Sequence, residues 1–273
     1  MMQNYSVLMS VYQKEKPEYL RQAIKSIQSQ TVPTNDFVLV CDGPLNPELD
    51  AVIAAKQQEM GSVLNVVRLA KNSGLGSALN EGIQHCKNEL VARMDSDDIA
   101  YPDRCEKQLA MFSAHTEISI CSGIVEEFTT SPEIIDARRV PPETSVEIVE
   151  FAKKRCPFNH PCVMYKKSAV EAAGSYQDFY LLEDYYLWLR MLMAGYQGYN
   201  IQEPLLHMRA GSDMYRRRAG WKYAKTQAKL FKFMKDSGFI GSGQYIKSCV
   251  IRIGSALAPN WLRKFVFGKV LRK

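Results

Sequence analysis

The first hundred residues alternate between short apolar runs and amphipathic helical segments, and this alternation restricts the folds open to the chain. Four runs are β-prone, show no helical period and are predicted to be buried strands: residues 5–11, 37–41, 63–69 and 89–94. Helical patterns lie between them, the first opening at Pro17 and the others at residues 47–60 and 75–86. Such alternation predicts βαβ units, and therefore an α/β fold with a mostly parallel central sheet and helices on both faces.

Polar side chains follow the predicted strands at the point where each strand ends. They are Tyr12, Asp42, Asn72 and Asp95. Ligands of open parallel sheets bind at the carboxyl ends of the strands, because the ends meet at one edge. The sequence therefore predicts a ligand site at this edge.

The regular alternation fades after about residue 115. The elements predicted there are strands at 117–128 and 162–165 and helices at 144–154, 167–173, 182–194 and 215–236. Thr144, with Glu147 three residues later, is the sequence signature of a helix capping box. Since neither an internal repeat nor a low-complexity linker occurs, we expect one compact domain with a C-terminal appendage.

Composition and cysteine usage exclude several classes of protein. With 46% hydrophobic and 23% charged residues, the chain is an ordinary globular protein and not a disordered or collagen-like one. Seven cysteines without a C-x-x-C pair suggest neither a disulfide framework nor a zinc site. No apolar run approaches the roughly 18 residues that a membrane-spanning helix needs, and the N-terminus lacks the basic region of a signal peptide. We therefore expect a cytoplasmic protein.

The charge is unevenly distributed along the chain. From Arg209 onward there are 16 Lys or Arg residues and two acids, a net charge of +14, whereas residues 1–208 carry a net charge of −8. Such asymmetry suggests an anionic partner, which could be nucleic acid, a membrane surface or a phosphorylated substrate. The alternative is a solvated helical face.

The sharpest local motif is Asp95-Ser96-Asp97-Asp98, directly after a predicted buried strand. Three carboxylates in four residues repel one another unless a cation lies among them, and hard divalent cations prefer such oxygen ligands. A calcium-binding loop fits poorly, because Ala100 replaces the glycine that its turn needs. The motif is also compatible with a phosphatase of the Asp-x-Asp type and with a solvated acidic turn.

Two further motifs are less specific when taken alone. A glycine-rich segment, Asn72 to Gly82, opens a predicted helix and could bring backbone N–H groups close to a ligand, although a plain loop explains it as well. Glu183 and Asp184 open another predicted helix, where the helix dipole favours negative charge whatever the function.

Together these segments resemble the family-2 glycosyltransferases, which have the GT-A nucleotide-diphospho-sugar transferase fold. The resemblance covers roughly residues 5–210. It rests on Ser6 to Tyr12, Asp42-Gly43, Asn72-x-Gly74, Asp95-x-Asp97-Asp98, Asn159-His160-Pro161, and Glu183-Asp184 with Trp188 and Arg190 behind them. It implies a catalytic domain over residues 1–210, with a nucleotide-binding half (1–98) and an acceptor half (99–210), followed by a basic helical extension (211–273).

The resemblance also implies roles for individual residues. The nucleotide would be held by Val11, Tyr12, Asp42, Asn72, Gly74, Asp95 and Arg209. Asp42 would accept the N3–H of a uracil, which favours a UDP-sugar donor. Mg²⁺ or Mn²⁺ would be bound by Asp97, with Asp95 and His207 as further candidate ligands. Asp184 would be the catalytic base, with Glu183 as the alternative, and His160 would lie on the acceptor side unless it is a packed core residue.

These roles describe an inverting, metal-dependent glycosyltransferase. A cation on Asp97 would stabilise the departing diphosphate, and one carboxylate would deprotonate the acceptor hydroxyl as it attacks. The Asp42-Gly43-Pro44 turn resembles the branch that extends bacterial surface polysaccharides, which implies a glycan or polyprenyl-diphosphate-linked acceptor. The alternatives are a sugar-1-phosphate nucleotidyltransferase, and a non-enzymatic protein that binds anionic polymers through its basic tail. Since the body is acidic and the tail has no nucleic-acid motif, we do not expect nucleic acid as the partner.

The C-terminal extension shows an apolar stripe at helical spacing. Its members are Ile246, Cys249, Val250, Ile253, Ala256 and Leu257. Beyond Pro259, Trp261, Phe265 and Phe267 are interleaved with cations, which are Arg263, Lys264, Lys269, Arg272 and Lys273. Such a segment suits the surface of an anionic bilayer, so we expect peripheral binding to the inner face of the cytoplasmic membrane. The alternative is that the stripe packs on the catalytic domain.

Overall fold

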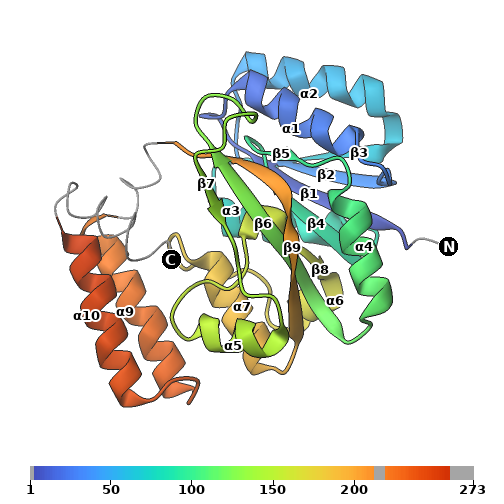
Figure 1. The fold of residues 1–273 in the computed structure, drawn as a ribbon. Coiled ribbons are helices and arrows are strands. Elements are labelled where there is room, and N and C mark those ends of the chain that lie inside the picture. Colours follow the sequence, from blue (N-terminus) through green and yellow to red (C-terminus); the bar gives the residue numbers. More distant parts are fainter. Residues whose placement is uncertain (1–2, 212–218, 259–273) are drawn as a thin grey trace.

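The computed structural model describes residues 3–211 and 219–258 and has an α/β fold built around a nine-stranded sheet (Figure 1). The strand order is β3-β2-β1-β4-β8-β6-β9-β5, with β7 paired to β6. The first four strands are β1 (Tyr5–Val11), β2 (Asp36–Cys41), β3 (Leu64–Arg68) and β4 (Leu90–Asp95). All pairings among them are parallel, which confirms the prediction for this half of the chain.

The second half of the sheet is mixed. Its strands are β5 (Ile99–Ala100), β6 (Ile118–Phe128), β7 (Ala137–Arg139), β8 (Met164–Lys166) and β9 (Gln197–Arg209). β8 runs antiparallel to both β4 and β6, whereas β9 runs parallel to β6 and antiparallel to β5. β9 was not predicted from the sequence, and it carries Arg209 to the end of β4, where the predicted site lies.

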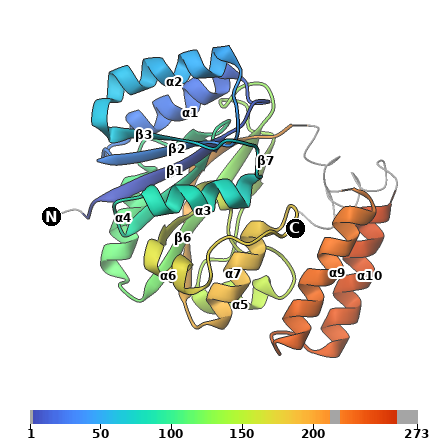
Figure 2. The same ribbon diagram turned by 180° about the vertical axis from the view of Figure 1, so that it is seen from behind.

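Helices cover both faces of the sheet (Figures 1 and 2). They are α1 (Pro17–Gln28), α2 (Pro47–Met60), α3 (Leu75–His85), α4 (Arg104–Ala114), α5 (Ser145–Ala152), α6 (Lys167–Ala172) and α7 (Glu183–Met193), with short 3₁₀ turns η1 (Gly61–Val63) and η2 (His160–Cys162). The capping box that Thr144 and Glu147 predict is present at the start of α5.

Alternate residues of the central strands belong to two separate hydrophobic clusters, one on each face of the sheet. Val7 and Met9 of β1 pack with α1, α2 and α4 on one face, while Leu8 packs with α3, α6 and α7 on the other. Burial on both faces explains why these strands are continuous apolar runs in the sequence. It also fixes the register, since a slip of one residue would exchange the two faces.

The C-terminal extension forms a helical hairpin of α9 (Gly220–Asp236) and α10 (Ser242–Leu257). Leu230, Phe231 and Met234 of α9 are buried in the same cluster as α7, and the ring of Phe233 packs edge-on against Tyr186 at 4.9 Å. The hairpin is therefore packed on the α/β domain through α9. Among the described residues, no helix is both long and apolar enough to cross a membrane.

Candidate active site

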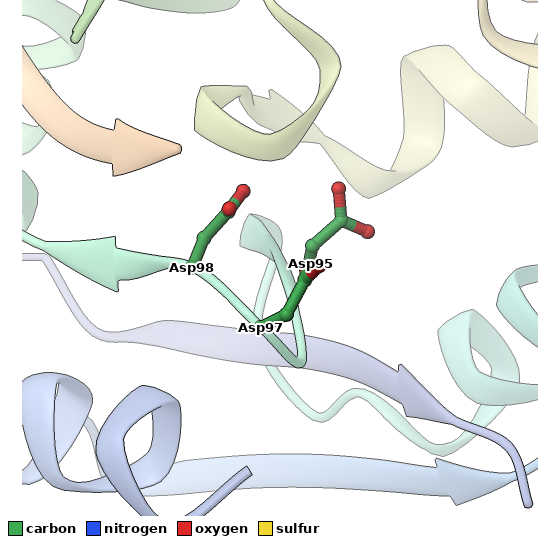
Figure 3. Close-up of side chains that lie close together, drawn as sticks. All are labelled: Asp95, Asp97 and Asp98. Carbon is green, nitrogen blue, oxygen red and sulfur yellow. The ribbon is translucent and has the colours of Figure 1, made fainter. Parts of the chain in front are cut away.

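The acidic motif forms the turn between β4 and β5. Ligand atoms of Asp95, Asp97 and Asp98 all lie within 4.8 Å of one another. Figure 3 shows that the side chains of Asp95 and Asp98 project to the same side of this turn. Asp95 and Asp97 are half-buried, whereas Asp98 is only 1% exposed. The turn thus concentrates three carboxylates at the carboxyl end of a central strand.

Two arginines lie beside this cluster. Arg93, fully buried inside β4, donates a hydrogen bond to Asp95. The backbone N–H of Arg209 donates to Asp98 at 2.9 Å, and its Nε donates to the carbonyl of Asp97 at 3.2 Å. The end of β9 therefore holds the acidic turn in place.

The guanidinium of Arg209 is clamped between two aromatic rings. It lies 3.7 Å from the ring centroid of Tyr19 and 4.6 Å from that of Phe128. Stacking of this kind suits the flat guanidinium and fixes its orientation next to the carboxylates. The structure therefore brings Arg209 to the predicted site.

Burial and the repulsion between neighbouring carboxylates favour either protonation of the cluster or the binding of a cation. Burial, the neighbouring Asp95 carboxylate and Glu15 raise the pKa of Asp97 to about 7. Burial and the neighbouring carboxylates of Asp97 and Asp95 also raise the pKa of Asp98, whose Oδ2 is buried without a hydrogen-bond partner among the described residues. A set of hard oxygen ligands that repel one another fits Mg²⁺ or Mn²⁺.

We predict that the affinity for Mn²⁺ depends on pH in the range where Asp97 titrates. With a pKa of about 7 when folded and an ordinary value of 3.8, Asp97 keeps an extra proton in the folded, metal-free protein between these values, so stability falls as pH rises from 4 to 7. A cation must displace that proton, and we expect the apparent affinity for Mn²⁺ to fall about tenfold from pH 8 to pH 6. Calorimetric titration at both pH values measures this. Equal affinities, or the same pH dependence in Asp97→Asn, would contradict it.

Asp42 organises the glycine-rich loop. One of its carboxylate oxygens accepts a hydrogen bond from the N–H of Ser73 at 2.7 Å, and the other accepts one from Gly74 at 3.0 Å. The Asn72 amide donates to the carbonyl of Asp42 at 3.1 Å. Gly74 has a φ of +87° and is the N-cap of α3, a conformation that favours glycine. Asp42 is 4% exposed, and the backbone N–H groups of Ser73 and Gly74 are hydrogen-bond donors to its carboxylate.

The other predicted nucleotide-binding residues lie at the same edge. The backbone N–H of Asp42 donates to the carbonyl of Val11 at 2.8 Å, which joins the ends of β1 and β2. Val11 is buried, whereas the Tyr12 side chain is 40% exposed. The structure therefore brings Val11, Tyr12 and the loop of Asn72 and Gly74 together around Asp42, with Tyr12 as the member most open to a ligand.

The two acids that open α7 have different surroundings. The Glu183 carboxylate accepts a hydrogen bond from the N–H of Leu181 at 3.2 Å and lies beside α3, where a Cβ on Gly76 would be 3.3 Å from its Cγ. The Asp184 carboxylate instead accepts a hydrogen bond from the thiol of Cys156 at 3.7 Å. Glu183 is thus engaged in joining α7 to α3, and Asp184 is turned towards a different neighbour.

His160 is packed and hydrogen-bonded. Its Nε2 lies 3.1 Å from the hydroxyl of Tyr176, and its ring packs against the buried Trp188. Burial and the nearby Arg93 lower the pKa of His160, so the imidazole is neutral. Burial also raises the pKa of Tyr176, with Asp184 and Asp95 adding to the rise. Tyr176 therefore lies within the electrostatic range of both the acidic turn and the start of α7.

His207 does not join the predicted metal cluster. It pairs with Ile99 in the β5–β9 ladder, its ring stacks on Tyr101 at 4.3 Å, and its Nδ1 lies 3.7 Å from a Glu126 carboxylate oxygen. The cluster of candidate metal ligands in the acidic turn consists of Asp95, Asp97 and Asp98 and does not include His207. The physical reason is position: His207 lies before the end of β9, and only Arg209, two residues further, reaches the acidic turn.

Four residues of the site were not singled out from the sequence: Glu15, Arg93, Cys156 and Tyr176. Glu15 accepts a hydrogen bond from Ser96, inside the acidic motif, at 2.8 Å. The only sequence signal for any of them was the charge of Arg93 within an otherwise apolar strand. The remaining three approach the site through tertiary contacts between distant segments.

Comparison with known proteins identifies the class of this site. The family model for glycosyl transferase family 2 matches residues 6–174. The amylovoran biosynthesis glycosyltransferase AmsE of Erwinia amylovora is 39% identical over 268 residues, which cover 97% of this chain and 98% of AmsE. The Escherichia coli enzyme UDP-Gal:alpha-D-GlcNAc-diphosphoundecaprenol beta-1,3-galactosyltransferase is 37% identical over 272 residues, covering 98% of this chain and 97% of the enzyme.

Solved structures share the fold. TarS from S. aureus in complex with UDP-GlcNAc aligns with a TM-score of 0.69 at 15% identity, covering 97% of this chain and 73% of TarS. The mannosyltransferase PcManGT from Pyrobaculum calidifontis, in complex with GDP-Man and Mn²⁺, aligns with a TM-score of 0.64 at 13% sequence identity. The alignment covers 99% of this chain and 81% of PcManGT.

The protein is therefore a glycosyltransferase with the GT-A fold. More particularly, the chain belongs to glycosyltransferase family 2, as the family model and the nearly full-length relatives show. Glycosyl transfer, and not nucleotidyl transfer or a purely binding function, is the activity of this class. The predictions for fold and enzyme class are confirmed.

Proposed function

We propose that this enzyme transfers a hexose from a UDP-sugar to a hydroxyl of a glycan acceptor carried on polyprenyl diphosphate, with inversion at the anomeric carbon. The observation that carries the proposal is the cluster of Asp95, Asp97 and Asp98, whose ligand atoms lie within 4.8 Å of one another beside Arg209, at the carboxyl end of β4. The E. coli relative supports both substrates by its name, and TarS supports the nucleotide. Polymer synthesis agrees with the name of AmsE.

The nucleotide would bind across the ends of β1 and β2. Tyr12 offers an exposed ring for the base, and the backbone of Asn72 and Gly74 lines the adjoining loop. The Asp42 carboxylate accepts two hydrogen bonds from that loop, and its remaining lone pairs could accept the N3–H of a uracil. In this arrangement Asp42 both shapes the nucleotide site and reads the base.

The diphosphate would lie over the acidic turn. Asp97 and Asp95 would hold Mg²⁺ or Mn²⁺, and the cation would supply Lewis-acid stabilisation of the leaving diphosphate. Arg93 fixes the orientation of the Asp95 carboxylate through its hydrogen bond. Arg209 donates hydrogen bonds to the Asp98 carboxylate and to the backbone carbonyl of Asp97, and it adds positive charge at the same edge.

Asp184 would act as the catalytic base on the acceptor hydroxyl. Its carboxylate takes the proton while the hydroxyl oxygen attacks the anomeric carbon, so that no free alkoxide forms. A single displacement with one base inverts the anomeric centre, and an α-linked donor gives a β-linkage. Cys156 donates a hydrogen bond to this carboxylate and orients it. With a lipid-linked acceptor, the reaction that we propose would take place at the cytoplasmic face of a membrane.

A donor screen tests the proposal. The protein is incubated with Mn²⁺, a synthetic GlcNAc-diphosphate-lipid and either UDP-Gal, UDP-Glc, UDP-GlcNAc or GDP-Man, and released nucleotide and product linkage are measured by chromatography and NMR. We expect transfer from one UDP-hexose, with UDP-Gal as the first candidate, and a β-linked product. A preference for GDP-Man, or an α-linked product from an α-linked donor, would contradict the proposal.

A further inference from the structure

One face of α10 is apolar and exposed. The hydrophobic residues on it are Ile246 at 61% exposure, Val250 at 68%, Ile251 at 43% and Leu257 at 40%. They lie on one side of the helix together with Lys247 and two glycines, and no acid occurs in α10. Single exposed apolar residues are common, but a contiguous group on one helix face marks an interaction surface.

The structure divides the stripe that the sequence predicts. Cys249, Ile253 and Ala256, together with Tyr245, pack against the hydrophobic cluster on the side of α10 that faces α9. Ile246 and Val250 remain outside. Half of the stripe is thus covered by α9 within the extension itself, and the other half is left with no partner among the described residues.

The hairpin that carries this face is strongly cationic. Residues 219–258 include seven Lys or Arg and one acid, Asp236, a net charge of +6. The lysines of α9 recur at 222, 225, 229 and 232, on the side of the helix opposite its buried residues. All four are exposed.

We infer that the α9–α10 hairpin binds an anionic lipid surface, with the exposed face of α10 inserted among the head groups. Apolar side chains would enter the interface beside the exposed Lys247 of α10, while the lysines of α9 would attract the anionic surface over a longer range. Packed helices lie about 8–10 Å apart, so the cations of α9 stay near one Debye length, about 8 Å at physiological salt, from a bilayer that contacts α10. This surface lies beyond the proposed function and does not depend on it.

Charge favours lipid over the other possible occupants. A second copy of the chain would place two hairpins of +6 against each other, and like charges oppose such a contact. Residues 259–273 carry five Lys or Arg and no acid, so the same repulsion opposes their packing on the hairpin. An anionic bilayer instead complements both the hairpin and the residues that follow it.

The hairpin also touches the segment that leads to the proposed base. Lys222 lies over the ring of Tyr180 at 3.8 Å, and Lys229 over Phe179 at 4.7 Å. Both aromatic residues precede Asp184 by at most five positions. In both views α10 is on the far side of α9 from the sheet (Figures 1 and 2), so a bilayer that contacts α10 would lie on the side of the hairpin away from the sheet.

Vesicle flotation of the full chain tests the inference. Wild type, the pair variant Ile246→Glu/Val250→Glu and the control Val146→Glu are mixed with phosphatidylcholine vesicles with or without phosphatidylglycerol. Val146 is a matched control because it is 76% exposed but isolated, on α5. We expect wild type and control to float only with anionic vesicles at low salt, and the pair variant to partition at least tenfold less.

Two further measurements keep the test decisive. Circular dichroism and melting temperature establish that the pair variant is folded, and size-exclusion chromatography detects self-association. Equal flotation of a folded pair variant would overturn the assignment of α10. A dimer that the pair variant dissociates, without any flotation of wild type, would show that a second copy covers the face. None of these readouts needs transferase activity, so a failed donor screen leaves the result interpretable.

Discussion

Asp97→Ala should lower the rate of sugar transfer by at least 10³-fold while leaving the protein folded. The variant removes the carboxylate proposed to hold the cation on the diphosphate, and several kcal/mol of leaving-group stabilisation would be lost, where each ~1.4 kcal/mol is tenfold in rate. Burial and the neighbouring Asp95 and Glu15 carboxylates raise the pKa of Asp97 to about 7. Removing the Asp97 carboxylate relieves repulsion, so the metal-free variant should melt at or above the wild-type temperature.

The measurement combines steady-state kinetics with thermal shifts in EDTA and in Mn²⁺. Wild type should gain stability with Mn²⁺, and Asp97→Ala should gain none. Asp103→Ala is the matched control, since Asp103 lies six residues further, outside the cluster, and pairs with Lys107. Turnover of the Asp97 variant near the wild-type rate, or undiminished wild-type turnover in excess EDTA, would refute the metal assignment.

The combination of lost activity and retained stability follows from how the site is built. Asp98 is buried, and its Oδ2 has no hydrogen-bond partner among the described residues. Burial and the neighbouring carboxylates raise the pKa of Asp97. A carboxylate cluster that served the fold alone would be paired with cations on all sides. Here Arg93 and Arg209 hold the turn by hydrogen bonds to Asp95, to Asp98 and to the backbone, and leave the cluster short of positive charge.

The N-terminal half of the fold was predictable because its strands are buried on both faces. Leu8 and Met9 lie on opposite sides of β1 and both are fully buried, so the strand is a continuous apolar run that short-range patterns detect. The ends of such strands then locate the site, and Asp42 and Asp95 lie where the alternation places them.

The C-terminal half was less predictable because its strands depend on distant partners. β9 contains Pro204 and several exposed polar residues, and its ladder with β6 has register shifts near Ile124. No local period marks such a strand. The contacts of Arg209 with the acidic turn depend on this pairing, as does the separation of His207 from the cluster. The sequence named Arg209 as a nucleotide-binding candidate and His207 as a candidate metal ligand, but it could not show which of them lies at the acidic turn.

The surroundings of Asp184 were also beyond local patterns. Cys156 and Tyr176 reach the start of α7 from loops that follow α5 and α6. In the sequence, Glu183 and Asp184 are adjacent acids at one helix start, and it is the family resemblance that favours Asp184 as the base. The structure separates them, because Glu183 turns to Leu181 and α3.

Asp184→Asn should remove most of the activity while donor binding stays within a few-fold of wild type. The amide keeps the size of the carboxylate and can still accept a hydrogen bond from Cys156, but it cannot take a proton from the acceptor hydroxyl. Loss of general-base catalysis typically costs about 10²–10⁴-fold in rate. The kcat for transfer and the Kd for UDP in the presence of Mn²⁺ measure the two effects separately.

Glu183→Gln is the matched control for that experiment, because it makes the same isosteric change at the adjacent position. Its carboxylate accepts a backbone hydrogen bond and packs beside Gly76, so the amide should lower thermal stability while kcat changes by less than about tenfold, far below the loss of a general base. The reverse pattern, with Asp184→Asn active and Glu183→Gln inactive but folded, would transfer the role of base to Glu183. The two acids differ in direction: Glu183 turns to Leu181 and α3, whereas Asp184 accepts a hydrogen bond from the thiol of Cys156.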